Sequence, residues 1–267
     1  MKAKALLIDI TQCVGCNNCQ AACKEANRQP DTVENRLTPT AYTALQEYEG
    51  GVYVRRMCQH CKEPTCASVC PVGAFTKTAE GPVLYDESKC IGCRYCIQAC
   101  PFQVPRYEWS SNNPRVRKCR LCAERVAAGQ PTACAEACPT GATKFGDRDE
   151  LLKEAYERIR NNPTGYVHRV YGVTEVGGTS VLYLSAVPFE KLGFKTQVET
   201  TPLPALTANA MEKIPGVVTV GTALLYGIYW ITNRREEVAR AEGGPAVLRD
   251  KLTRGSDDHD GHIGHGK

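Results

Sequence analysis

The sequence predicts an α+β fold that is duplicated around cysteine-rich sites and followed by one membrane-spanning helix. Three observations support this prediction: sixteen cysteines in 267 residues, an internal repeat among them, and one uncharged run near the carboxyl end. The cysteines form four groups, which are, in order, Cys13, Cys16, Cys19 and Cys23; Cys58, Cys61, Cys66 and Cys70; Cys90, Cys93, Cys96 and Cys100; and Cys119, Cys122, Cys134 and Cys138. Every cysteine therefore belongs to a group of four.

The spacing within the groups is typical of iron-sulfur clusters. Groups one and three read C-x-x-C-x-x-C-x-x-x-C, and a proline follows the last cysteine of three groups, at Pro71, Pro101 and Pro139. In this bacterial pattern the closely spaced thiolates bind one [4Fe-4S] cluster, while the fourth cysteine of a run ligates the neighbouring cluster. Sixteen thiolates therefore predict four [4Fe-4S] clusters, held by runs that interlock in pairs.

Two other uses of cysteine fit the spacing less well. Structural zinc takes C-x-x-C motifs as two separated pairs, not as triplets with a trailing Cys-Pro. A disulfide framework is typical of small secreted domains, whereas this chain is long enough to bury a core and its cysteines lie within a few residues of each other. We therefore expect neither zinc nor disulfides.

The groups are of two types. Groups one and three share an aspartate four residues before the first cysteine, at Asp9 and Asp86. In both groups the first cysteine is followed directly by a hydrophobic residue and then a glycine. Groups two and four share Cys-Pro-x-Gly-Ala, at 70–74 and 138–142. A duplicated two-cluster ferredoxin is the simplest source, so we predict two ferredoxin-like units. The repeat itself is compatible with sequential and with nested pairing of the groups.

Three elements are expected outside the cysteine groups. Residues 42–57 alternate around a Glu-Gly-Gly turn at 49–51, which indicates a hairpin. Asp147, with a glutamate three residues later, opens an apolar-periodic stretch that meets Asn-Asn-Pro at 161–163, which predicts a capped helix with a defined end. Residues 188–211 are rich in Pro and Thr and are expected to form an extended connector over the surface.

One run near the carboxyl end is predicted to cross a membrane. Residues 214–233 contain no charged side chain and lie between Lys213 and Arg234-Arg235. About twenty helical residues span a hydrocarbon core of roughly 30 Å, and a buried core helix is the alternative. Because Arg234, Arg235 and Arg240 follow the run, the carboxyl end is expected in the cytoplasm and the cluster-bearing part in the periplasm.

The five histidines add negative expectations. None lies in the apolar run, so any haem is expected to belong to another subunit. His60 is expected to pack near a cluster without ligating it. His259, His262 and His265 stand among aspartates and glycines in a tail that is expected to be disordered.

Charge excludes one class of partner. A formal net charge of +4 gives no nucleic-acid footprint, so no nucleic-acid partner is expected. A local basic segment, Arg115, Arg117, Lys118 and Arg120, surrounds Cys119. Cationic groups favour the reduced form of a nearby cluster, and a solvated basic loop is the alternative.

The chain resembles the four-cluster electron-transfer subunits of molybdenum and tungsten enzymes, above all the β subunit of membrane-bound formate dehydrogenase. The matching stretches are residues 118–122 (KCRLC), 129–130 (GQ), 137–142 (ACPTGA), 145–146 (FG), 177–179 (GGT) and 181–183 (VLY). Residues 187–190 (VPFE) are similar to the corresponding subunit of a membrane-bound nickel-iron hydrogenase, which is the alternative family. A free ferredoxin-like carrier is a third reading, which the membrane helix argues against.

The resemblance implies that group one pairs with group four and group two with group three. The implied ligand sets, named quartets from here on, are A (Cys13, Cys16, Cys19, Cys138), B (Cys23, Cys119, Cys122, Cys134), C (Cys58, Cys61, Cys66, Cys100) and D (Cys70, Cys90, Cys93, Cys96). The expected organisation is a first ferredoxin-like unit at 1–50 and 101–187, a second at 51–100, a connector at 188–212, the membrane helix at 213–234 and a polar tail at 235–267.

The resemblance further implies a role within a membrane complex. Electrons would pass from a catalytic molybdenum, tungsten or nickel-iron subunit to a quinone-reactive membrane subunit such as a cytochrome b. No nucleophile-base set, phosphate loop or dinucleotide fingerprint appears, so the chain is expected to be a non-catalytic subunit. Its first residues leave no room for a signal peptide, so export with a partner that carries a twin-arginine signal is expected.

Overall fold

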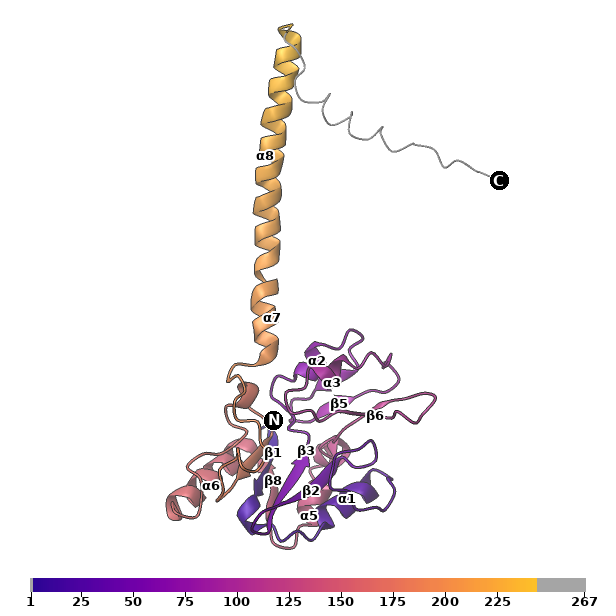
Figure 1. Ribbon diagram of the computed structural model, residues 1–267, viewed down its shortest axis with the longest axis vertical. Helices are drawn as coiled ribbons and strands as arrows, with labels where there is room; N and C mark the ends of the chain where they lie inside the picture. The colour runs from indigo at the N-terminus through magenta and orange to yellow at the C-terminus, as the bar shows by residue number, and fades with distance from the viewer. Residues whose placement is uncertain (1, 244–267) are drawn as a thin grey trace, which may run out of the picture. The chain divides into compact units, whose positions relative to one another are not determined.

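The computed structural model describes residues 2–243 and divides into two compact units at Thr207 and Ala208. Most of the predicted polar tail, including its three histidines, lies outside the described residues. The first unit contains both helices and strands, which confirms the α+β prediction (Figure 1).

A three-stranded sheet lies at the centre of the first unit. It consists of β1 (Lys4–Asp9), β8 (Thr143–Asp147) and β9 (Val181–Leu184), in the order β8-β1-β9. β1 runs antiparallel to β8 and parallel to β9. The sheet thus joins the amino end of the chain to two segments that follow the last cysteine.

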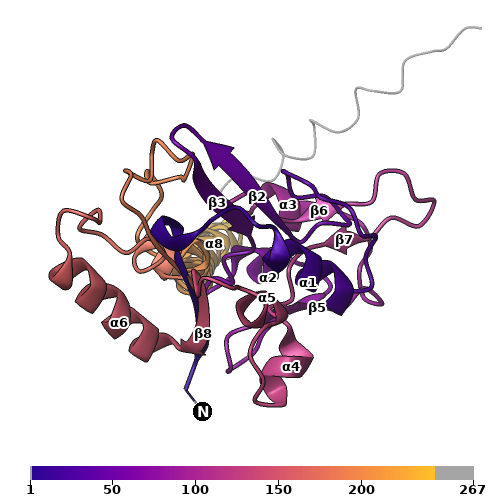
Figure 2. The same cartoon turned by 90° about the horizontal axis from the view of Figure 1, so that it is seen from below.

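The two faces of this sheet bury different partners. Alternate side chains of a strand point to opposite faces. On one face Leu7 and Leu182 pack against Leu151 and Ala155 of α6 (Arg148–Asn161), which covers that face (Figures 1 and 2). On the other face lies a core that includes Leu6, Ile8, Val181, Tyr183 and three cysteines, Cys19, Cys119 and Cys134. The sheet therefore separates α6 from the cysteine-lined interior.

Helix α6 confirms the prediction made from its sequence, with a difference at its start. The helix ends at Asn161, directly before Asn162-Pro163. Asp147 precedes it but makes no capping hydrogen bond, because its carboxylate accepts from Lys4 Nζ at 2.5 Å. Acidic residues in the first turn and arginines in the last complement the helix dipole instead.

The predicted hairpin is also confirmed. Strands β2 (Thr43–Tyr48) and β3 (Val52–Met57) pair in antiparallel register around Gly50 and Gly51, whose φ angles are +80° and +71°. Glycine adopts this left-handed conformation without a steric cost, and two such residues suit a tight hairpin turn. The hairpin carries Arg55 into the interior, where the side chain is 3% exposed.

Short elements surround the cysteines. They are α1 (Asn18–Ala26), α2 (Thr65–Ser68), α3 (Tyr95–Gln98), α4 (Ala123–Ala127), α5 (Ala133–Glu136), the strand pairs β4 (Phe75–Lys77) with β5 (Val83–Tyr85) and β6 (Arg106–Tyr107) with β7 (Val116–Arg117), and the 3-10 helices Ile10–Gln12 and Glu175–Gly177. Helix α1 contacts α5, and α2 contacts α3. A further apolar core, separate from the two that cover the central sheet, includes Phe75, Val83 and Cys96 and lies around groups two and three. Helices from groups one and four are thus neighbours, as are those from groups two and three.

The expected surface connector differs from the structure. Phe189, Leu192 and Phe194 are buried, and the Phe194 ring lies 4.8 Å from that of Tyr171 and 5.0 Å from that of Tyr183, between centroids. Further on, Leu203–Met211 forms helix α7. The aromatic side chains bury here because they complete the core beside β9, which outweighs the local proline and threonine content.

The second unit contains one long helix, α8 (Lys213–Ala241). The helical run Leu203–Ala241 is long enough to cross a membrane, and an 18-residue stretch within it has a mean hydropathy of 1.5. Helix α8 buries none of its side chains. Thr232 donates a hydrogen bond to the Ile228 carbonyl at 2.9 Å, so its hydroxyl is satisfied within the helix. The helix begins at the predicted residue and continues beyond the predicted end.

Candidate metal centres

All sixteen cysteines are free thiols in the described chain, so none is used in a disulfide. Most are buried or half-buried, and Cys16 and Cys93 are the exposed ones. The thiolate form is the metal ligand of cysteine. What matters for a metal centre is therefore which thiols lie together and which groups offset their charge.

The turns that carry the cysteines are equivalent in groups one and three. Gly15 and Asn17 have φ angles of +71° and +61°, and Gly92 and Arg94 have +73° and +63°. Helices α1 and α3 begin directly after these turns. Alternating right- and left-handed residues gather backbone N–H groups into a concavity that suits anions, iron-sulfur clusters included. One such group, the Gly92 N–H, donates to Cys90 Sγ at 3.4 Å.

Groups two and four make similar turns with residues other than glycine. His60 and Leu121 have φ angles of +48° and +53°, and each is 1% exposed. A left-handed residue of this kind costs about 1–3 kcal/mol and persists where its surroundings fix it. Leu121 donates its backbone N–H to Cys119 Sγ at 3.3 Å, so the strained turn places a donor against a thiol.

His60 offers a test of whether a cluster fits this interior. Burial lowers the pKa of His60, so the ring is neutral, and its Nδ1 accepts from the Val83 N–H at 2.9 Å. The ring proton therefore lies on Nε2, which is buried and has no hydrogen-bond partner among the described residues. A buried donor without an acceptor is unfavourable. A sulfur-rich group held by Cys58 and Cys61, on either side of His60, would supply acceptors, so the residues fit such a group.

The thiols of quartet A lie together. Burial raises the pKa of Cys13 and Cys19, and Cys138 raises both further, although it is more than a hundred residues away in the sequence. All four thiols of the quartet line one small enclosed cavity with Arg55. Group one and group four therefore meet here.

The thiols of the other three quartets are also neighbours. Burial raises the pKa of these thiols most, and neighbouring thiols raise it further. In quartet B, Cys134 and Cys122 raise the pKa of Cys23, and Cys23 raises that of Cys119. Cys58 and Cys100 raise the pKa of Cys61 and Cys66 in quartet C, and Cys90, Cys93 and Cys70 raise that of Cys96 in quartet D. Thiols assigned to the same quartet are thus neighbours in the structure, although no three cysteines of the described residues are arranged to hold a single metal ion.

Interactions between quartets link them in one order. Cys134 of B raises the pKa of Cys19 of A, Cys58 of C raises that of Cys119 of B, and Cys96 of D raises that of Cys66 of C. The sequence of neighbours is therefore A, B, C, D. The two exposed cysteines, Cys16 and Cys93, belong to A and D, so each end of the row reaches the surface.

The D end presents an apolar surface. Tyr95 and Trp109 are 61% and 72% exposed and line an open groove with Cys93. Arg94 lies over the Trp109 ring, 5.2 Å from its centroid. Exposed aromatic residues beside a reachable cysteine are suited to contact with another protein.

The residues of the basic segment around Cys119 lie in two different environments, one near the surface and one buried. Arg117 and Arg120 form ion pairs with Glu108 and Glu124 near the surface, as a solvated loop would. Lys118 is buried and donates to the carbonyl oxygens of Val83 and, at 3.0 Å, Cys119. Its charge also lowers the pKa of Cys66. Only this lysine of the segment therefore lies among the thiols as a buried cation.

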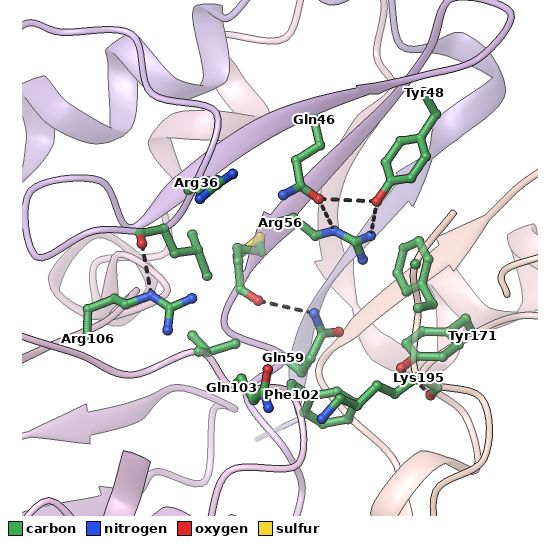
Figure 3. A pocket seen from close by; sticks show the side chains of 15 residues that line it. Arg36, Gln46, Tyr48, Arg56, Gln59, Phe102, Gln103, Arg106, Tyr171 and Lys195 are labelled. Carbon is green, nitrogen blue, oxygen red and sulfur yellow. Dashed lines mark hydrogen bonds between the residues drawn. The ribbon is translucent and has the colours of Figure 1, made fainter. Parts of the chain in front are cut away.

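A basic pocket lies beside the end of β3 (Figure 3). Its volume is about 490 Å³, and its walls include Gln59 and Phe102, which follow Cys58 and Cys100 closely in the sequence. Arg36, Arg56 and Arg106 line it, together with Lys195, and none of its lining residues is acidic. The pocket therefore gathers four positive charges with no carboxylate among its lining residues.

Gly15 offers a local test of the quartet A geometry. An alanine Cβ at this position would lie 2.6 Å from the Tyr53 ring, which lines the same cavity, and φ is +71°. We expect Gly15→Ala to lower the iron content of quartet A, measured by its EPR signal. Gly51→Ala, also at φ +71° but with open space around it, is the control for backbone strain alone, about 1–2 kcal/mol. Equal effects of the two variants would contradict this account of the cavity.

Comparisons with known proteins also indicate iron-sulfur clusters. A family model described as a 4Fe-4S dicluster domain matches residues 50–148. The chain is 33% identical to the hydrogenase-2 operon protein HybA of Escherichia coli O157:H7, over 90% of this chain and 87% of that protein. It is 40% identical to the nitrate-inducible formate dehydrogenase iron-sulfur subunit of Escherichia coli K12, over 67% of each.

A third relative covers more of the chain. A protein of Nitratidesulfovibrio vulgaris is 41% identical over 91% of this chain and 70% of its own length. The predicted resemblance is confirmed by these matches, which include the hydrogenase-related alternative. The chain belongs to the family of iron-sulfur electron-transfer subunits that includes the formate dehydrogenase β subunits and HybA.

Proposed function

We propose that quartets A to D each hold one [4Fe-4S] cluster, in two interlocked ferredoxin-like units, and that the chain conducts electrons between a catalytic subunit and a quinone-reactive membrane subunit. The linkage of the quartets in the order A, B, C, D, with an exposed cysteine at each end, carries this proposal. Bound clusters supply one-electron transfer between neighbouring sites.

The chain's own residues hold and tune these sites. Thiolates supply the ligands, and backbone N–H groups such as that of Leu121 donate to them. Buried cations, Arg55 and Lys118, offset negative charge in the interior. Two apolar cores pack around the buried thiols and shield them from water. Substrate chemistry belongs to the partner in this proposal.

For the catalytic partner we propose a formate dehydrogenase with molybdenum or tungsten. The higher identity to the formate dehydrogenase iron-sulfur subunit favours it. A nickel-iron hydrogenase is the second candidate, because the HybA match extends over 90% of the chain while the formate dehydrogenase match extends over 67%.

For the membrane we propose that α8 spans the bilayer, in contact with lipid, with its carboxyl end in the cytoplasm and the first unit in the periplasm. Arg234, Arg235 and Arg240 follow the apolar run, while Lys213 alone precedes it. Arg240 lies 3.7 Å from Glu236, yet topology follows lysine and arginine counts and depends little on acidic residues.

The proposal predicts the composition of the complex. After anaerobic purification we expect about sixteen iron atoms and sixteen acid-labile sulfides per copy of this chain. Metal analysis of the co-purifying large subunit is expected to find molybdenum or tungsten. About eight irons would contradict the four-cluster proposal. Nickel in the large subunit would replace formate dehydrogenase by the hydrogenase candidate and leave the electron-transfer role intact.

A further inference from the structure

Arg55 occupies an unusual position in β3. Its side chain is 3% exposed, and Nη2 donates to Cys134 Sγ of quartet B at 3.0 Å. The guanidinium is fixed by two hydroxyls from other strands, with Nε donating to Thr43 Oγ1 at 2.8 Å and Nη1 to Thr143 Oγ1 at 3.0 Å. The same residue lines the cavity of quartet A. Arg55 therefore contacts a thiol of quartet B and faces the cavity of quartet A.

The buried charge of Arg55 has no carboxylate partner among residues 2–243. Its hydrogen-bond partners in the described chain are the hydroxyls of Thr43 and Thr143 and the sulfurs of Met57 and Cys134, with no carboxylate among them. Burying an unpaired cation costs several kcal/mol. Negative charge on clusters at quartets A and B would offset this cost.

The influence of Arg55 on nearby thiols reaches both quartets. In quartet B the guanidinium contacts Cys134 Sγ, and in quartet A it lines the same cavity as Cys13, Cys19 and Cys138. A guanidinium keeps its proton at every pH at which proteins fold, unlike a lysine or a histidine. The arginine is therefore charged under all ordinary conditions and acts as a fixed positive charge.

We propose that Arg55 is the shared counter-ion of the clusters in quartets A and B and raises the reduction potentials of both. This inference rests on the proposed function, because it requires clusters at A and B. Reduction adds one electron to a site, and the added negative charge is stabilised by a cation fixed in a low-dielectric interior. Arg55 keeps its proton throughout, so no proton transfer accompanies the step.

The neighbouring residue provides a matched control. Arg56 lies next to Arg55 in β3, but its Nε donates to Gln46 Oε1 at 2.8 Å and its Nη2 to Tyr48 Oη at 2.7 Å, in the basic pocket (Figure 3). Its guanidinium lies over the Phe194 ring, 4.4 Å from the centroid. Removing the charge of Arg56 changes the same strand without touching quartet A or B.

The test is a redox titration of the intact complex, followed by cluster-resolved EPR, for Arg55→Gln, Arg55→Lys and Arg56→Gln. In Arg55→Gln we expect the equilibrium constant for reduction of the A cluster, and of the B cluster, to fall by about tenfold or more. A tenfold fall lowers the reduction potential of a one-electron couple by about 59 mV. Clusters C and D should keep their wild-type potentials. Arg55→Lys should keep A and B near wild type, because the charge is retained. Arg56→Gln should leave A and B unchanged.

The outcomes separate a charge effect from a structural one. If Arg55→Gln fails to retain clusters A and B while Arg55→Lys retains them, the charge requirement is supported. Equal shifts in Arg55→Lys and Arg55→Gln, a shift of all four clusters, or the same shift in Arg56→Gln would overturn the inference. About sixteen irons with unchanged potentials would refute only the role of Arg55. A wild-type chain without clusters at A and B would refute the proposed function.

Discussion

Replacing Cys138 by serine is expected to remove the cluster of quartet A and to leave quartet B loaded, although Cys134 of quartet B is only four residues away. Cys138 lines the cavity formed with Cys13, Cys16 and Cys19. Burial raises the pKa of Cys138, but the Thr143, Thr140 and Ala142 N–H groups outweigh it, so the pKa lies below its ordinary value. A serine hydroxyl does not form the anion that the site stabilises, so the fourth ligand of A is lost.

Cys134→Ser is the matched control for Cys138→Ser. Cys134 lies in α5 and belongs to quartet B, so its replacement should remove the B signal and keep A. Cluster-resolved EPR of both variants measures the result, and iron content should fall by about four atoms per chain in each. Loss of the B signal in Cys138→Ser, with A intact, would show that Cys138 ligates the cluster of its own group and that the nested pairing is wrong. Loss of the D signal instead would indicate that groups three and four pair, as in the sequential arrangement.

The parts of the fold that sequence predicted well are those fixed by local interactions. The hairpin follows from alternation around Gly50 and Gly51, and α6 from a period of apolar residues that stops before Pro163. The left-handed turns of groups one and three also depend on near neighbours, with glycine at the first of the two positions. In these cases the signal and the structure lie within about fifteen residues of each other.

The role of Arg55 depends on contacts that no local pattern contains. Two adjacent arginines in a strand point to opposite faces, and the sequence does not say which one faces the thiols. Arg55 is the one that faces the thiols, because it donates to Cys134 and Thr143, which are 79 and 88 residues away in the sequence. The alternation of side chains in β3, combined with the nested pairing, would have limited the choice of the buried cation to Arg55 or Arg56.

The aromatic residues after β9 illustrate tertiary context outweighing composition. Phe189 and Phe194 stand in a segment that looks like a connector by its Pro and Thr content, but their rings lie 5.3 Å apart, between centroids, and pack with Tyr171. Burying each aromatic side chain contributes about 1.5–3 kcal/mol, which outweighs the local preference for an extended surface segment. A count of large apolar residues in 188–194 would have indicated the buried part.

Deleting residues 214–267 is expected to release the complex from the membrane while electron flow to a soluble dye continues. All sixteen cysteines lie in the first compact unit, which ends before α8, so the metal centres do not depend on the deleted helix. About twenty apolar residues supply the anchoring free energy. Quinone reduction should fall by at least about tenfold more than dye reduction, because the quinone stays in the bilayer. Membrane fractionation and the two activity assays on each fraction measure this.

Deletion of residues 244–267 alone is the control, since it keeps the whole of α8, and that complex should stay in the membrane with both activities. Topology is measured on the full-length chain with a carboxyl-terminal reporter that is fluorescent only when it folds in the cytoplasm. Because three arginines follow the apolar run, we expect fluorescence. Equal losses of dye and quinone reduction after removal of α8 would mean that the helix belongs to the folded core of the metal-binding unit, and the membrane-spanning proposal would then be wrong. A dark reporter would reverse the proposed orientation without affecting the anchoring role.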